Sequence, residues 1–138
     1  MNKILVLGCG TWGSAIAQSL SNNAHLVTMW HYNKDKLLNF NTTRIHPNLL
    51  NFTFNSNINF DYNLENSLSD SEIVVIATPS SSVRDIVAKI NPYLKDNQII
   101  VNTAKGLEAK SLLRMSEVIS EEATITNFDN IVSLYGPS

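Results

Sequence analysis

The sequence has a single cysteine, Cys9, among 138 residues. A disulfide within the chain and a metal site built from several cysteines are therefore excluded, and we expect no metal centre. Charged residues make up only 16% of the chain and its formal net charge is −2, so no strong field attracts nucleic acid or anionic lipid. No apolar run is long enough to span a bilayer, and the first one, Ile4–Leu7, is too short for a signal peptide. We expect a cytoplasmic protein without a nucleic-acid or membrane partner.

The composition that remains is that of an ordinary globular protein, with 43% hydrophobic residues. This length is enough for one domain with its own core and short for a two-domain enzyme. We interpret residues 1–138 as one domain.

Short apolar runs alternate along the chain with segments of helical period. Continuous apolar runs such as Ile73–Ala77 and Ile99–Val101 are typical of central strands covered by helices on both faces. The alternating segments are Ile4–Leu7, Trp12–Ser21, Leu26–Trp30, Ile73–Ala77, Val83–Ile90, Ile99–Val101, Leu112–Ile119 and Ile131–Leu134. Such alternation predicts βαβ units, and hence an α/β fold with a doubly wound, mostly parallel sheet.

The pattern weakens between Phe40 and Leu68, where asparagine is abundant. We predict a long loop there, with one weak strand near Ile58–Tyr62. No function is attached to the asparagines.

Three glycines, Gly8, Gly10 and Gly13, have the spacing G-x-G-x-x-G directly after the first predicted strand and at the start of a helix. In a dinucleotide-binding fold the first permits a tight turn, the second lets a pyrophosphate approach the backbone, and the third lets the helix pack close to the strand. The helix N-terminus then offers free N–H groups to the phosphates. The alternative is a glycine-rich turn that binds nothing. Cys9 within the turn is interpreted as a small buried side chain.

The second predicted strand ends without the acidic residue that often binds the ribose hydroxyls of NAD, about 20 residues past the glycines. His31, Tyr32, Asn33 and Lys34 occupy this position. Without a carboxylate to repel a 2′-phosphate, NADP is favoured over NAD, and His31 or Lys34 is a candidate partner for that phosphate. The alternative is that these are solvated turn residues.

Three later segments follow predicted strands, where ligands of doubly wound sheets bind. In Ala77–Ser82 the serines are expected to cap the helix near Val83 or to contact the ribose on the nicotinamide side of the cofactor. In Asn102–Glu108, Lys105 beside a glycine is placed to reach a phosphate or carbonyl, although a surface lysine would look the same. The third segment is Tyr135–Ser138.

Taken together, these elements resemble the bacterial-type NAD(P)-dependent glycerol-3-phosphate dehydrogenase. The resemblance rests on Gly8–Ala15, Val27–Trp30, Ala77–Ser80, Thr103–Glu108 and Gly136–Ser138. It implies a Rossmann-like fold and reversible reduction of dihydroxyacetone phosphate to sn-glycerol 3-phosphate for glycerophospholipid synthesis. It also implies cofactor contacts from Thr11, Trp12, His31 or Tyr32, and Lys105, and substrate contacts from Lys105, Gly136 and Ser138.

Two features depart from this family. The stretch Asn48–Asn51 stands where the family has a Tyr-Leu-Pro-Gly-like element. In the family a helical C-terminal domain follows, carrying the lysine thought to act as general acid and base, and Lys110 is wrongly placed to replace it. We therefore expect a truncated, split or cut-down N-terminal part that is inactive alone. We also expect self-association or marginal stability from uncovered apolar surface, and a second domain in trans is a candidate partner.

Two other functions stay open at this point. One is a reductase of another oxo acid, with the same glycine turn. The other is a stand-alone nucleotide-binding or partner-docking module.

Overall fold

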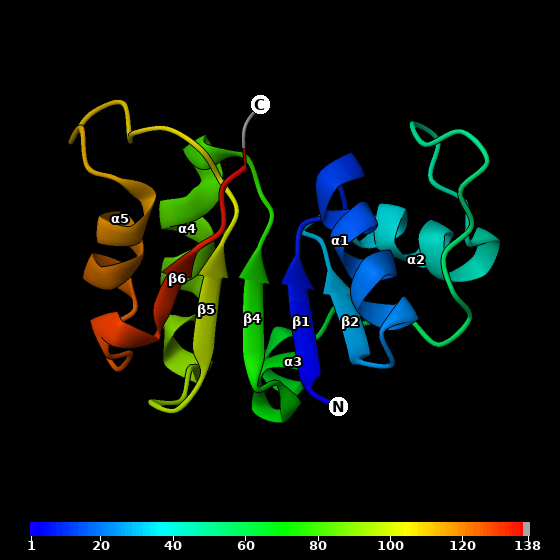
Figure 1. Ribbon diagram of the computed structural model, residues 1–138, viewed down its shortest axis with the longest axis horizontal. Coiled ribbons are helices and arrows are strands. Elements are labelled where there is room, and N and C mark those ends of the chain that lie inside the picture. Colours follow the sequence, from blue (N-terminus) through cyan, green and yellow to red (C-terminus); the bar gives the residue numbers. More distant parts are fainter. Residues whose placement is uncertain (137–138) are drawn as a thin grey trace.

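Six parallel strands form one sheet in the computed structural model, which describes residues 1–136 (Figure 1). Their order is β3-β2-β1-β4-β5-β6, and every neighbouring pair is parallel. The strands are β1 (Lys3–Leu7), β2 (Leu26–Trp30), β3 (Asn59–Phe60), β4 (Ile73–Ile76), β5 (Ile99–Asn102) and β6 (Ile131–Ser133). This order is that of the doubly wound dinucleotide-binding fold, so the predicted Rossmann-like class is confirmed.

Helices cover both faces of the sheet, but different halves of it. In Figure 1, α1 and α2 lie in front of β1 and β2, whereas α4 and α5 lie on the side of β4, β5 and β6 away from the viewer. The helices are α1 (Thr11–Asn22), α2 (Lys34–Thr43), α3 (Leu64–Asp70), α4 (Val83–Ile90) and α5 (Met115–Glu122), with short 3₁₀ turns at Ser80–Ser82, Asn91–Tyr93 and Phe128–Asn130.

The sheet separates two hydrophobic cores because successive strand residues point to opposite faces. Leu5, Val74, Ile76 and Ile100 belong to the core beneath α3, α4 and α5. Their strand neighbours, such as Val6, enter the core beneath α1 and α2. Ile73–Ala77 and Ile99–Val101 are therefore central strands, as predicted. The expected cover by helices on both faces is wrong within the described chain, since Ile99 is 39% exposed.

The asparagine-rich segment is more ordered than the predicted long loop. Helix α2 continues to Thr43, and α3 begins at Leu64, so that prediction is wrong at both ends; the weak strand near Ile58–Tyr62 is confirmed as β3. Phe54 and Ile58 are almost fully buried in the core beneath α1 and α2. Asn55 fastens the segment to α1, since its side chain donates to Ser21 Oγ at 3.1 Å and to Asn22 Oδ1 at 2.7 Å.

Two further expectations need correction. The helix predicted over Leu112–Ile119 begins only at Met115, because Leu112 has a positive φ of 60° that a helix does not accept. Before α4, the serines form a 3₁₀ turn, and the Ser82 side chain makes no capping hydrogen bond. The expected serine cap of α4 is therefore absent.

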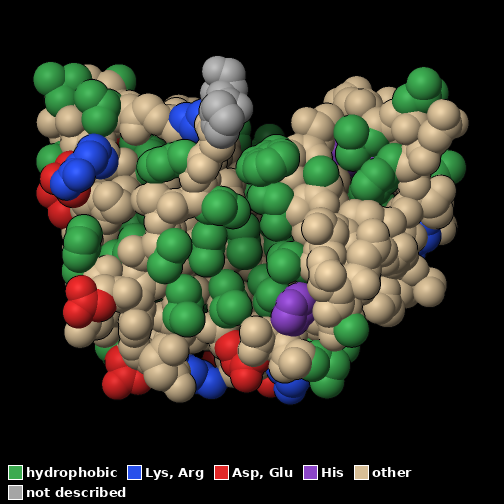
Figure 2. Space-filling model, viewed as in Figure 1, with side chains coloured by type: hydrophobic (Ala, Val, Ile, Leu, Met, Phe, Trp, Pro, Cys, Tyr) green, Lys and Arg blue, Asp and Glu red, His purple; other side chains and the backbone are tan. Residues whose placement is uncertain are grey.

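One part of the sheet carries no helix within residues 1–136. On the face shared with α1, the side chains of Ile73, Ile99, Val101 and Val132 stand over β4, β5 and β6; we call these four residues the open face. Ile99 and Val132 are 39% and 46% exposed, and Figure 2 shows hydrophobic side chains gathered over these strands. Among the described residues, no helix is long and apolar enough to cross a membrane.

Candidate functional site

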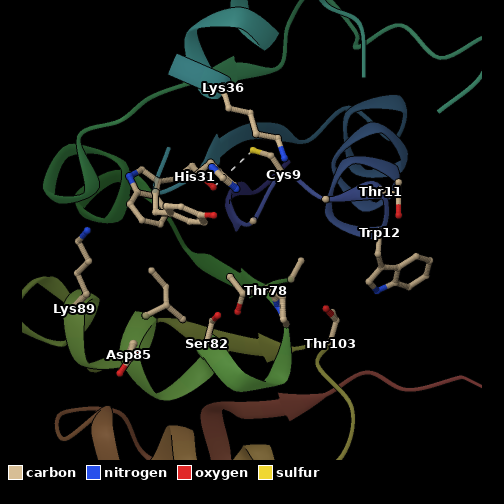
Figure 3. Close-up of a pocket in the computed structure, with 17 residues that line it drawn as sticks. Cys9, Thr11, Trp12, His31, Lys36, Thr78, Ser82, Asp85, Lys89 and Thr103 are labelled. Atoms are coloured by element: carbon tan, nitrogen blue, oxygen red, sulfur yellow. Dashed lines mark hydrogen bonds between the residues drawn. The ribbon is translucent and has the colours of Figure 1, made fainter. Parts of the chain in front are cut away.

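The main cleft of the molecule lies at the carboxyl ends of β1, β2 and β4, where the chain crosses from one face of the sheet to the other (Figure 3). Its volume is about 670 Å³, within the range that holds a nucleotide-sized ligand. Its walls are formed by residues 8–12, 30–32, 77–79 and 85–86 together with Lys36, Ser82, Lys89 and Thr103. This is the position at which doubly wound folds bind ligands.

Gly8 forms the tight turn that the spacing predicted. Its φ is +114°, which side chains rarely adopt, and its N–H donates to Trp30 O at 2.9 Å. A Cβ at this position would lie 2.6 Å from Ala77 O. The floor of the cleft is thus backbone against backbone, and only glycine fits there.

Gly13 and Gly10 differ in the space around them. A Cβ on Gly13 would collide with Gly8 O and approach Ala77 Cβ to 3.2 Å, so α1 can lie on the strand end only with glycine there. Around Gly10 nothing lies within 4 Å of an added Cβ. Gly10 is also the N-cap of α1 and offers no side-chain acceptor, so the first N–H groups of the helix stay available to a ligand in the cleft.

His46 holds the glycine turn through a hydrogen bond from a distant segment of the chain. This residue was not identified from the sequence. It is 2% exposed, and its Nε2 donates to Cys9 O at 3.0 Å while its Nδ1 accepts from Asn48 N–H at 3.1 Å. These two bonds imply the tautomer with hydrogen on Nε2. A partner that is 37 residues away in sequence left no local signal.

Cys9 itself is fully buried, as expected. Burial raises the pKa of its thiol to about 12, and its Sγ lies 3.8 Å from Trp30 O. A thiol that stays protonated is a poor nucleophile. Cys9 therefore packs as a small buried side chain in the core beneath α1 and α2.

One wall of the cleft lies at the end of β2 and is formed by Trp30, His31, Tyr32 and Lys36. The rings of His31 and Tyr32 stack with their centroids 4.3 Å apart. Burial and then the charge of Lys36 lower the pKa of His31 below its ordinary value, so the ring is neutral near pH 7. Lys34 is not in this wall, since its Nζ lies 5.8 Å from the ring centre of Tyr62.

The opposite wall comes from the ends of β4 and β5. Thr103 Oγ1 donates to Ile76 O at 2.8 Å, which ties the two strand ends together. Thr78 Oγ1 is buried in the wall of the cleft and has no hydrogen-bond partner in the described structure. Buried hydroxyls are almost always satisfied, so this one calls for a ligand or water.

The loop after β5 holds Lys105 at the same edge of the sheet, although its side chain does not line the cleft. Asn102 fixes the loop by donating to Ala104 O at 3.1 Å and accepting from Ala104 N–H at 3.0 Å. Lys105 is exposed beside Gly106, whose φ is +92°. The structure thus presents Lys105 to solvent on a fastened loop.

Glu108, at the far end of that loop, is an anchor. Arg84 of α4 donates to both of its carboxylate oxygens, at 2.7 and 2.8 Å, and also pairs with Glu121 and Glu122 of α5. The bonds from Arg84, and then from Ser111, lower the pKa of Glu108 to about 2. The acidic end of the Lys105–Glu108 stretch therefore holds the loop and faces away from a ligand.

The last predicted site residues follow β6. Gly136 is exposed, with open space around it, and Ser138 lies outside the described residues. Tyr135 OH accepts from Asn102 Nδ2 at 3.1 Å, which brings the end of the chain beside the loop of Lys105. In the described part of the chain, no group of three or more metal-binding side chains occurs.

Comparison with known proteins agrees with this geometry. The family model described as "NAD-dependent glycerol-3-phosphate dehydrogenase N-terminus" matches residues 3–138. A glycerol-3-phosphate dehydrogenase [NAD(P)+] of a Thermoanaerobacter species is 40% identical over 99% of this chain and 40% of its own length. The corresponding protein of Fusobacterium nucleatum is 38% identical, over all of this chain and 41% of its own length.

The likeness extends to solved structures. The crystal structure of glycerol-3-phosphate dehydrogenase from Coxiella burnetii superposes with a TM-score of 0.83 and 25% identity, covering 91% of this chain and 38% of that one. This chain spans about 40% of the length of the curated relatives it matches.

Proposed function

Because this chain belongs to the NAD-dependent glycerol-3-phosphate dehydrogenase N-terminal family, we propose that it is the cofactor-binding part of a dehydrogenase that interconverts dihydroxyacetone phosphate and sn-glycerol 3-phosphate. The observation that carries this proposal is the glycine turn at the floor of the cleft. Gly8 and Gly13 are required there by backbone contacts, whereas Gly10 leaves space for a ligand. A turn that bound nothing would have no need of glycine at position 10.

The cleft fits a nicotinamide dinucleotide, NAD or NADP. Gly8, Gly10, Thr11 and Trp12 line the cleft and receive the pyrophosphate at the N-terminus of α1, where free N–H groups and the helix dipole favour negative charge. Gly13 serves the cofactor by letting α1 lie close to the strand end. His31 and Tyr32 lie beside the adenosine ribose. The unpartnered Thr78 Oγ1 supports this fit, because the nicotinamide side of the cofactor offers polar groups to satisfy it.

Substrate binding is assigned to Lys105, Gly136 and Ser138. The cation of Lys105 offsets negative charge on the carbonyl oxygen and the phosphate of the substrate, and backbone N–H groups with a hydroxyl complete a phosphate cradle. The cofactor supplies the hydride when it is bound. The general acid that protonates the resulting alkoxide is a lysine outside residues 1–138 in this proposal, so the chain alone binds but does not turn over.

The domain arrangement follows from the open face. We propose that residues 1–138 form one domain, to which a helical domain is added, in cis or in trans, and that the chain self-associates when this partner is lacking. The exposed Ile99 and Val132 support this, because contiguous uncovered apolar surface mediates association. A cytoplasmic location stays a prediction.

The proposal is tested by NADPH oxidation with dihydroxyacetone phosphate. We expect no turnover by this chain alone, and turnover when it is mixed with the separately expressed helical domain of a complete relative. Calorimetry with NADH and NADPH measures cofactor binding separately. Turnover by the chain alone would refute the assignment of the general acid, whereas failure to bind either cofactor would refute the proposed function itself.

A further inference from the structure

Lys36 occupies a position in the cleft that the spacing of the sequence did not reveal. It is the third residue of α2 and is half-buried. Figure 3 shows its side chain extending from α2 toward Cys9 in the glycine turn. No carboxylate of the described chain pairs with it within 4 Å. A half-buried cation without a protein counter-charge stands at the edge of the nucleotide site.

The backbone around Lys36 is fixed before any ligand arrives. Its N–H donates to Asn33 Oδ1 at 3.1 Å, and Asn33 N–H in turn donates to His31 Nδ1 at 2.9 Å. These bonds hold the start of α2 and the ring of His31 in one arrangement. The side chain of Lys36 also passes the ring of Phe40, with its Nζ 5.6 Å from the ring centre. The backbone of Lys36 is thus held in place, and its side chain lies near the ring of Phe40.

Two lysines line the cleft near this wall, Lys36 from α2 and Lys89 from α4. His31 is neutral near pH 7, because burial and Lys36 itself lower its pKa. Lys34 lies outside the lining of the cleft. Lys89 lines the cleft from α4, with its Nζ 5.0 Å from the centre of the Trp30 ring, and Asp85 lies on the same helix, across the cleft from Lys36 (Figure 3).

In a dinucleotide site, the charge of the side chains near the end of the second strand decides which form of the ribose binds. The end of the second strand borders the adenosine ribose, where an acidic side chain selects the free hydroxyls of NAD. Here no acid stands between Trp30 and Asn33, and a lysine is present instead. A cation near the ribose can form an ion pair with a phosphate on the ribose 2′-oxygen.

We propose that Lys36 pairs with the 2′-phosphate of NADP(H) and is the residue by which this chain prefers NADP(H) to NAD(H). The inference rests on the proposed function and deepens it. It assigns the 2′-phosphate to a lysine of α2, with His31 as a neutral neighbour that donates from Nε2, and it leaves Lys34 without a role in the preference.

The experiment uses two fragments of the cofactor that differ by the 2′-phosphate alone, adenosine 2′,5′-bisphosphate and AMP, with calorimetry on the 138-residue chain. Wild type is expected to bind the bisphosphate more tightly than AMP. Lys36→Gln is expected to lose about tenfold in affinity for the bisphosphate, the size of one charge-assisted contact, and to keep its affinity for AMP. Lys36→Arg retains the charge and is expected to retain the preference.

Lys34→Gln is the matched control, because it removes the same charge two residues away in the same helix. Circular dichroism melting curves show whether each variant is folded. An equal loss in Lys34→Gln, or an unchanged ratio of the two affinities in Lys36→Gln, would overturn the inference while the proposed function stands. Absence of binding of both fragments by folded wild type would overturn both.

Discussion

The three glycines of the turn make one prediction that separates folding from ligand binding. Each is replaced in turn by alanine, which adds one Cβ at three places with different surroundings. At Gly8 the new atom meets Ala77 O at 2.6 Å, at Gly13 it collides with Gly8 O, and at Gly10 it meets nothing within 4 Å. The same chemical change should therefore have three different results.

The magnitudes follow from these contacts. Gly8→Ala combines an unfavourable φ of +114°, about 1–3 kcal/mol, with overpacking against backbone, about 1–3 kcal/mol. We expect the free energy of unfolding to fall by about 2–6 kcal/mol. Gly13→Ala has only the overpacking and should cost about 1–3 kcal/mol. Gly10→Ala has an allowed φ of −69° and should stay within about 1 kcal/mol of wild type.

Urea unfolding followed by circular dichroism measures these differences, and a constant slope shows that the unfolding transition itself is unchanged. Calorimetry then measures the affinity for NADPH, which the unfolding experiment does not report. Gly10→Ala should be folded and yet bind at least about tenfold more weakly, since its Cβ occupies the space expected for the pyrophosphate. If Gly10→Ala binds like wild type, or if Gly8→Ala is as stable as Gly10→Ala, the interpretation of the turn is wrong.

Three other changes test separate parts of the structure. His46→Ala removes a buried ring and its bond to Cys9 O, so denaturant titration should show a loss of about 2–4 kcal/mol; an unchanged midpoint would contradict the role given to His46. The pKa of Glu108 falls from 4.5 to about 2 beside Arg84, so its stabilisation is complete above pH 4.5 and disappears as the pH drops toward 2. The stability difference between wild type and Glu108→Gln should shrink over that interval, and a constant difference would count against the ion pair. Val132→Lys on the open face should reduce self-association in sedimentation experiments while changing stability by no more than about 0.5 kcal/mol, and undiminished association would place the contact elsewhere.

Much of the fold was predictable because its strands are built from continuous β-branched and aliphatic residues. Runs such as Ile73–Ile76 are continuous and apolar, and they alternate with helical segments. The glycine turn was predictable for a related reason, since the backbone contacts of Gly8 and Gly13 leave no room for a side chain. In both cases local sequence carries the constraint.

The remainder depends on contacts between distant segments. Helix α2 buries only Leu37 and Phe40, so its periodicity was too weak to mark its end at Thr43. Lys36 could not be separated from Lys34 in the sequence, because only the path of α2 decides which side chain enters the cleft. The role of His46 depends on a hydrogen bond that spans 37 residues.

The backbone floor of the cleft limits which parts of the site a substitution can change. Where Gly8 meets Ala77, the surface offered to a ligand is peptide backbone, whose chemistry no ordinary substitution alters. The walls differ, because His31, Lys36 and Thr78 face the cleft with side chains that a single substitution can change. Redesign of cofactor preference therefore belongs in the walls, where a change leaves the backbone contacts of Gly8 and Gly13 intact.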